Sequence, residues 1–219
     1  MGWKASCIFA SQLHEPKLLN SPSHDPAMAL RIAACLPLKA EPTEETTLEL
    51  GMHPDDLTIG AYGQSLIIGH HELSNTCFDG NVPPVIHGIN EILPNCHSLA
   101  ISLHSVVNLY GYALFDGLNL VRARAGSADD GEFLDIGEWV EEEQQLFAKS
   151  ELRNGERVFF DEIDGEIEEH DHSSYGEEFV FELSKRYFGE RLDCIDFWDL
   201  KMETFKPIKT SIIGRLFGR

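Results

Sequence analysis

The sequence lacks the features that mark membrane and secreted proteins. No apolar run approaches the roughly 20 residues that span a bilayer, and no charged start followed by a sustained apolar stretch opens the chain. We therefore expect neither a membrane span nor a secretory signal. The five cysteines include no CxxC pair, which indicates free thiols in a reducing compartment. A cytoplasmic location is predicted.

Motifs of several enzyme classes are also absent. The segment 60–65 does not match the phosphate-binding pattern GxxxxGK followed by Ser or Thr, and no GxSxG elbow precedes a helix. No two histidines four residues apart enclose a glutamate, as they do in zinc metalloproteases. No cofactor is therefore predicted, and the sequence leaves open whether the chain is an enzyme.

Basic residues are scarce: 17 Lys and Arg stand against 37 Asp and Glu, for a net charge of −20. The stretch from Asp129 to Glu182 holds 20 acidic residues and three basic ones. An acidic body repels the phosphate backbone, so no nucleic-acid partner is expected. An acidic face can attract a basic protein partner. The alternative is a solvated surface that keeps the protein soluble.

A chain of 219 residues fits one large domain. We place a single domain at residues 1–205 and a short basic tail at 206–219. The predicted fold class is α+β, with a mixed, mostly antiparallel sheet of about five to seven strands and two or three helices packed chiefly on one face. The sequence does not specify the oligomeric state.

The stretch from Ser98 to Gly137 organises this prediction. An apolar run from Ser98 to Phe115 precedes Asp116-Gly117, a pair that tolerates positive φ. An alternating run follows, so we expect a hairpin in the middle of the sheet. Further predictions are helices over residues 26–36, 85–93 and 177–188, a polar loop over 39–45 and an acidic, exposed loop over 161–174.

Four short motifs of this stretch occur in a recognisable order: HSVVN at 104–108, FDG at 115–117, LVR at 120–122 and DIGE at 135–138. They resemble the centre of an uncharacterised bacterial family of the domain-of-unknown-function type. The resemblance extends to the Met-Gly-x-Lys start and to Trp198-Asp199. It implies a fold and a compartment, but no function.

This sequence departs from the pattern of that family at two positions. Asn108 stands where relatives have Asp, and Leu109 stands where relatives have an aromatic residue. If that acid is catalytic in relatives, an enzymatic role of this chain is in doubt.

Histidines supply the candidates for chemistry. His170 and His172 alternate in the acidic loop and His70 and His71 are adjacent, so both pairs are candidate metal ligands. The alternative for the first pair is an exposed polar loop with weak, adventitious metal affinity. Adjacent residues of a strand point to opposite faces, so only one histidine of the second pair can face a common site. No tight metal site is predicted. In the central strand, His104, Ser105 and His97 are the catalytic candidates. His104 and Ser105 point to opposite sides of a regular strand, so they cannot form a nucleophile–base pair with each other.

Two hypotheses of function follow. The first is a non-enzymatic binding or inhibitory protein of the immunity type, which presents an acidic surface to a basic protein partner. The second is a small metal-assisted hydrolase that uses His104 with His97, His70 or His71. For the first hypothesis, the predicted partner-binding residues are Glu166, Glu168, Glu169 and Asp171.

Overall fold

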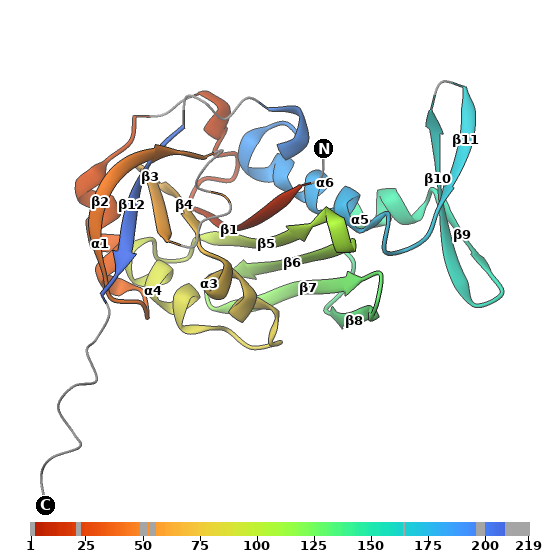
Figure 1. The fold of residues 1–219 in the computed structure, drawn as a ribbon, viewed down its shortest axis with the longest axis horizontal. Helices are drawn as coiled ribbons and strands as arrows, with labels where there is room; N and C mark the ends of the chain where they lie inside the picture. The colour runs from red at the N-terminus through yellow and green to blue at the C-terminus, as the bar shows by residue number, and fades with distance from the viewer. Residues whose placement is uncertain are drawn as a thin grey trace, which may run out of the picture.

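The protein has an elongated shape, with a compact body and an arm that projects from it (Figure 1). The structure is a computed structural model and describes residues 3–20, 23–48, 52, 56–163, 165–195 and 200–208. The pair Trp198-Asp199 and most of the predicted tail lie outside these residues. No helix of the described ranges is long and apolar enough to cross a membrane.

A nine-stranded sheet forms the body, and a separate three-stranded sheet forms the arm. All strand pairs in both sheets are antiparallel. The body sheet has the order β2-β12-β3-β4-β1-β5-β6-β7-β8 and the arm has the order β11-β10-β9. The strands are β1 Lys4–Ser11, β2 Ala40–Thr47, β3 Leu57–Tyr62, β4 Ser65–Gly69, β5 His97–His104, β6 Leu109–Asp116, β7 Asn119–Ser127, β8 Gly131–Ile136, β9 Ser150–Arg153, β10 Glu156–Ile163, β11 Glu166–His170 and β12 Lys201–Pro207.

The predicted α+β class is therefore wrong, because the described chain is mostly β, with 12 strands and five α-helices. The helices also cover both faces of the body sheet rather than chiefly one: α1, α3 and α4 lie on one face, and α5 and α6 lie on the other. Their bounds are α1 Pro26–Cys35, α3 His71–Asn75, α4 Pro84–Ile92, α5 Glu141–Phe147 and α6 Gly176–Phe188.

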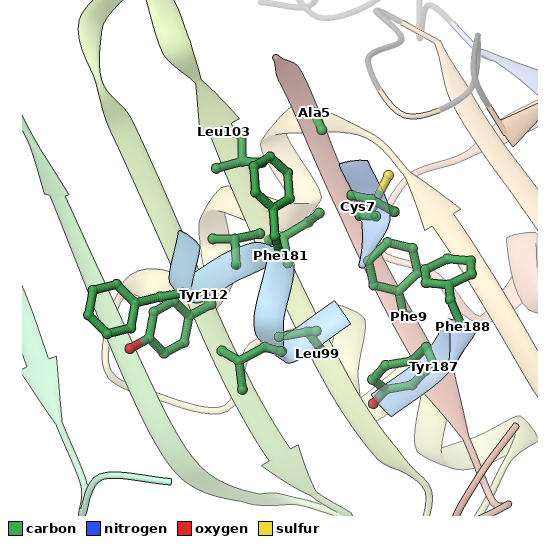
Figure 2. Packing of buried hydrophobic residues seen from close by; sticks show 14 of the residues in the cluster. Ala5, Cys7, Phe9, Leu99, Leu103, Tyr112, Phe181, Tyr187 and Phe188 are labelled. Atoms are coloured by element: carbon green, nitrogen blue, oxygen red, sulfur yellow. The ribbon is translucent and has the colours of Figure 1, made fainter. Parts of the chain in front are cut away.

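The strand β1 shows why both faces are covered. Cys7 and Phe9 point toward α6, whereas Ile8 and Ala10 point toward the layer of α1 and α4, and all four side chains are fully buried. Figure 2 shows aromatic residues of α6 packed on the first of these faces. There the rings of Phe9 and Phe188 meet edge to face, with 5.3 Å between their centroids. A strand that is apolar on both sides belongs inside a layered structure.

Three predicted helices are confirmed, and two have the termini that their sequences indicate. The Asp25 carboxylate accepts the Met28 backbone N–H and caps α1, which begins at a proline. Gly189 ends α6 in the left-handed conformation, with φ 84°.

The hairpin at Asp116-Gly117 is confirmed, with β6 and β7 paired through Asp116 and Asn119 and with φ 56° at Gly117. Its surroundings differ from the prediction. The run 98–115 contains two strands, β5 and β6, because the 3-10 turn Ser105–Val107 reverses the chain. The middle of the sheet is β1, and the hairpin lies toward the β8 edge.

Two predicted loops are strands, so those predictions are wrong. The segment predicted as a polar loop over 39–45 lies mainly in β2, the edge strand of the body. The acidic segment 161–174 contributes the end of β10 and all of β11. β2 and β11 are polar edge strands, so they lack the alternation of apolar and polar residues that marks a half-buried strand.

Candidate functional site

The arm formed by β9, β10 and β11 stands clear of the body in Figure 1. Residues 150–172 contain nine acidic residues and two arginines. Two large apolar side chains are also exposed on the arm, Leu152 at 66% and Ile167 at 73%. Projecting shape, charge of one sign and exposed apolar side chains together are typical of an interaction surface.

The four predicted partner-binding residues all lie on or beside β11, but they do not share one face. Glu166 and Glu168 alternate with Ile167 and point to one side of the arm. Glu169 points to the other side, where its carboxylate accepts a hydrogen bond from Arg153 at 2.7 Å. Asp171 follows the strand and caps a turn, accepting the Ser174 N–H at 2.8 Å.

An aromatic cluster fixes the root of the arm to the body. The ring of Phe159, in the middle of β10, is fully buried and stacks on Tyr175 at 4.4 Å between centroids. It also meets Phe147 of α5 at 5.7 Å and Phe179 of α6 at 5.8 Å. The arm is therefore held at its base by the same core that joins α6 to the body sheet.

A polar cluster lies beside this aromatic root. The His172 Nε2 atom lies 2.9 Å from the Tyr110 hydroxyl, 2.5 Å from the Arg124 Nη2 atom and 3.0 Å from a Glu132 carboxylate oxygen. Arg124 also donates from Nε to Glu132 at 2.5 Å. These contacts tie His172, just beyond β11, to β6, β7 and β8, so the cluster links the arm to the edge of the body sheet.

The charges in this cluster shift the pKa of Glu132. Burial alone would raise it, but the hydrogen bond with His172 and the charge of Arg124 outweigh burial and lower the pKa of Glu132 from 4.5 to about 2. The carboxylate is therefore ionised throughout the neutral and mildly acidic range, and the cluster keeps its ion pairs there.

We expect acid to weaken the fold partly through Glu132. A carboxylate with a lowered pKa in the folded state stabilises the protein above its unfolded pKa of about 4.5, and this contribution is lost as pH falls toward 2. The unfolding free energy of Glu132→Gln should therefore fall less steeply over this window than that of the wild type. Urea denaturation at a series of pH values measures both slopes, and parallel curves would contradict the assignment.

A second polar network lies under α5 and is centred on a fully buried ion pair. The Arg122 guanidinium donates to the Glu143 carboxylate from Nε at 2.8 Å and from Nη2 at 2.7 Å, and neither side chain is exposed. Glu143 also accepts the Tyr112 hydroxyl at 2.5 Å and the Val140 N–H at 3.0 Å. Arg122 further pairs with Asp135. Some acids of the 129–182 stretch therefore face inward, which lowers the surface charge that the sequence count implies.

A cleft of about 910 Å³ lies on the same side of the sheet, between the last turn of α6, the first turn of α5 and the loop 13–17. His97, a catalytic candidate, stands on its rim with its Nδ1 atom 3.4 Å from Asp116. Both side chains are more than half exposed. Bulk water therefore surrounds the pair, whereas catalytic groups gain most from sites that exclude water.

The other catalytic candidates lie elsewhere. His104 is at the opposite end of β5 from His97, paired with Lys4 and Leu109, so the two histidines do not share a site. The Ser105 hydroxyl accepts the Trp3 N–H at 2.6 Å and ties the 3-10 turn to the start of β1.

Among the described residues, the candidate metal ligands do not converge on one metal site. The His70 ring caps α3 and stacks on His71 at 5.6 Å between centroids, because these two residues begin a helix rather than continue a strand. His170 lies beside Asp161, whereas His172 faces Glu132. Within the described ranges, no three His, Cys, Asp or Glu residues are grouped in a way that could hold a metal ion.

Sequence reasoning missed the residues that join these features, above all Arg122, Arg124 and Glu143. Their common signal was the alternation of Arg122 and Arg124 in β7, which places two arginines on one face of a strand with an apolar sheet around it. Buried arginines need carboxylate partners, and the three glutamates that begin α5 supply one.

A family model matches most of the chain. The model of a family of unknown function, DUF6928, covers residues 5–156 of the 219. The chain belongs to this family. The predicted resemblance to a domain-of-unknown-function family is thus confirmed. The short central motifs and the bacterial origin are not tested by the match and stay predictions.

The DUF6928 match begins in β1 and ends at the start of β10. In sequence order, the match contains strands β1 to β8 of the body sheet, the α5 helix and β9, the first strand of the arm. No curated protein and no solved structure matches the chain. Membership of DUF6928 assigns no activity, so a function has to be proposed from the site itself.

Proposed function

We propose that the protein is a non-enzymatic binding protein that holds a basic protein partner on its acidic arm. The arm itself carries the proposal, because it combines two large exposed apolar side chains with nine acidic residues over 150–172. Apolar contacts supply affinity at the centre of an interface, and complementary charge speeds the encounter of the partners. A rigid root supports this use, since an ordered arm loses little entropy when it binds.

In its finer form, the proposal is an inhibitory role of the immunity type. A protein that covers a basic surface prevents that surface from meeting its own anionic ligand. The proposal includes a cytoplasmic location, which the five free cysteines support.

The metal-assisted hydrolase has less support. It needs His104 together with His97, His70 or His71, yet His97 and His104 stand at opposite ends of β5, and His70 and His71 begin a helix that follows β4. The cleft holds His97 alone of these four, in an exposed pair with Asp116.

Reversing charge on the arm tests the binding proposal. A library of displayed peptides is selected on the wild type and on the double variant Glu166→Lys/Glu168→Lys. We expect the wild type to enrich peptides with net positive charge, and the variant to lose this enrichment. The association rate of the best peptide should fall steeply between about 10 and 300 mM salt. Asp171 stays unchanged because it holds a turn.

The matched control is Glu41→Lys/Glu44→Lys, which reverses two exposed charges on β2 at the far edge of the body sheet. This variant should enrich the same cationic peptides as the wild type. Enrichment of neutral or acidic peptides, or equal loss in both double variants, would contradict an interface on the arm.

A further inference from the structure

β11 is one of the two outer strands of the arm, and among the described strands it has a neighbour on one side only. We propose that its free edge accepts an extended, cationic segment of the partner as an additional strand, paired through the backbone. This inference rests on the proposed function, because it specifies how the same arm would hold a basic protein.

The pairing of β10 indicates which backbone groups are available. The Phe160 N–H donates to the Lys149 carbonyl at 2.9 Å, on the β9 side of β10. Backbone groups alternate in direction along an antiparallel strand, so those of Phe159 and Asp161 face β11. Their partners there are His170 and Glu168. The intervening residues of β11, Ile167 and Glu169, therefore direct their N–H and C=O groups outward.

The edge of β11 is protected less completely than the edges of the body sheet. β2 carries Pro42 and pairs with β12 across a register shift, and β8 pairs with β7 across another. Prolines and bulges of this kind prevent further strands from adding to an edge. The pairing of β10 with β11 shows no shift, and β11 contains no proline. Of these protective features, β11 has only the charge of its side chains to oppose the addition of a further strand.

That charge selects the kind of strand that can add. Asp161 stands directly opposite Glu168, and Glu166 lies two residues along on the same face. Like charges opposite each other destabilise a sheet, and neither Glu166 nor Glu168 forms an ion pair within the described part of the chain. A cationic strand would relieve this repulsion. A second copy of the protein would bring the same acidic edge and increase it.

The side chains of β11 also predict a sequence pattern for the partner segment. Lys or Arg belongs opposite Glu166 and Glu168 on one face, and an apolar residue belongs beside Ile167 on the other. Because successive residues of a strand point to opposite faces, the matching segment alternates cationic and apolar residues.

A pair of synthetic peptides separates backbone pairing from charge attraction. The first alternates Lys and Val. The second has the same sequence with N-methyl groups on alternate residues, which keep its charge but block the backbone donors of one edge. We expect the first peptide to bind the wild-type protein at least about tenfold more tightly, by fluorescence anisotropy at low salt.

Two substitutions at one position provide the matching test on the protein. Ile167→Pro removes an outward N–H and leaves the ladder with β10 intact, so it should abolish the preference for the unmethylated peptide. Ile167→Ala keeps that N–H and should retain the preference. Circular dichroism verifies that both variants are folded, and the peptide comparison on the wild type stands even if the proline variant is not.

The outcomes distinguish this inference from the proposed function. Equal binding of both peptides, lost in Glu166→Lys/Glu168→Lys, would overturn strand addition and leave an acidic arm that attracts cations. Binding of neither peptide, or binding that survives the charge reversal, would overturn both proposals.

Discussion

Replacing Phe159 with alanine is expected to lower the free energy of unfolding by about 3–5 kcal/mol, the usual cost of removing a buried phenyl ring. The ring is fully buried and packs against Tyr175, Phe147 and Phe179. Its loss leaves a cavity between the arm, α5 and α6. Urea denaturation measures the change, and an unchanged m-value shows that the compactness of the two end states is the same.

The neighbouring residue supplies the control. Phe160 points to the other side of β10, where it is half-buried and has the Arg153 guanidinium 5.1 Å from its ring centroid. Phe160→Ala should cost about 1 kcal/mol or less, the value of an exposed cation–π contact. Equal costs at the two positions would show that the arm is not anchored through one face of β10.

Replacing Glu143 with alanine is expected to cost a similar amount, about 3–5 kcal/mol, because it leaves the buried Arg122 charge without its main partner. The substitution also removes the acceptor of the Tyr112 hydroxyl and of the Val140 N–H. Burial, followed by the charge of Glu143, raises the pKa of Tyr112 well above its usual value, so this hydroxyl stays protonated and needs an acceptor. Chemical denaturation at neutral pH measures the loss.

Glu142 provides a control one residue away. Its carboxylate pairs with Arg186 near the surface, at 2.6 and 2.7 Å, and Glu142→Ala should cost at most about 1 kcal/mol. The double variant Arg122→Met/Glu143→Leu should recover much of the stability lost in Glu143→Ala, since it removes both buried charges together. A small effect at Glu143, comparable to that at Glu142, would contradict a buried, strongly coupled pair.

Local signals predicted the elements whose termini they define. Asp25-Pro26 predicted the start of α1, and Gly189 predicted the end of α6, because capping depends on residues close in sequence. The Asp116-Gly117 turn was also predicted from adjacent residues, because the type of a tight turn depends on the residues within it. The family resemblance rested on these central residues too, and the family match covers them.

The arm was missed although its sequence contains comparable signals. Asn154-Gly155 joins β9 to β10 with φ values of 54° and 91°, as a two-residue hairpin turn requires. Farther along the chain, the segment 161–174 is so acidic that its composition suggested an exposed loop. A strand in a projecting sheet has solvent on both faces, so its sequence need not alternate apolar and polar residues.

The buried polar networks could not be predicted from local sequence. Arg122 and Glu143 are 21 residues apart, and Tyr110 and His172 are 62 apart. Which of the many carboxylates meets a given arginine depends on the packing of α5 against the sheet. The sequence shows which charged residues are available to these networks, but only the fold determines which carboxylate pairs with which arginine.

The position of β12 has a consequence for how the protein folds during its synthesis. This strand, near the end of the chain, lies between β2 and β3 in the sheet. During synthesis, β2 emerges from the ribosome well before β12, its neighbour among the described strands, and stays unpaired until β12 has followed. Until then the nascent sheet ends at β3, with an apolar edge open to other chains. The acidic, proline-containing sequence of β2 suits a segment that must remain unpaired and soluble during this interval.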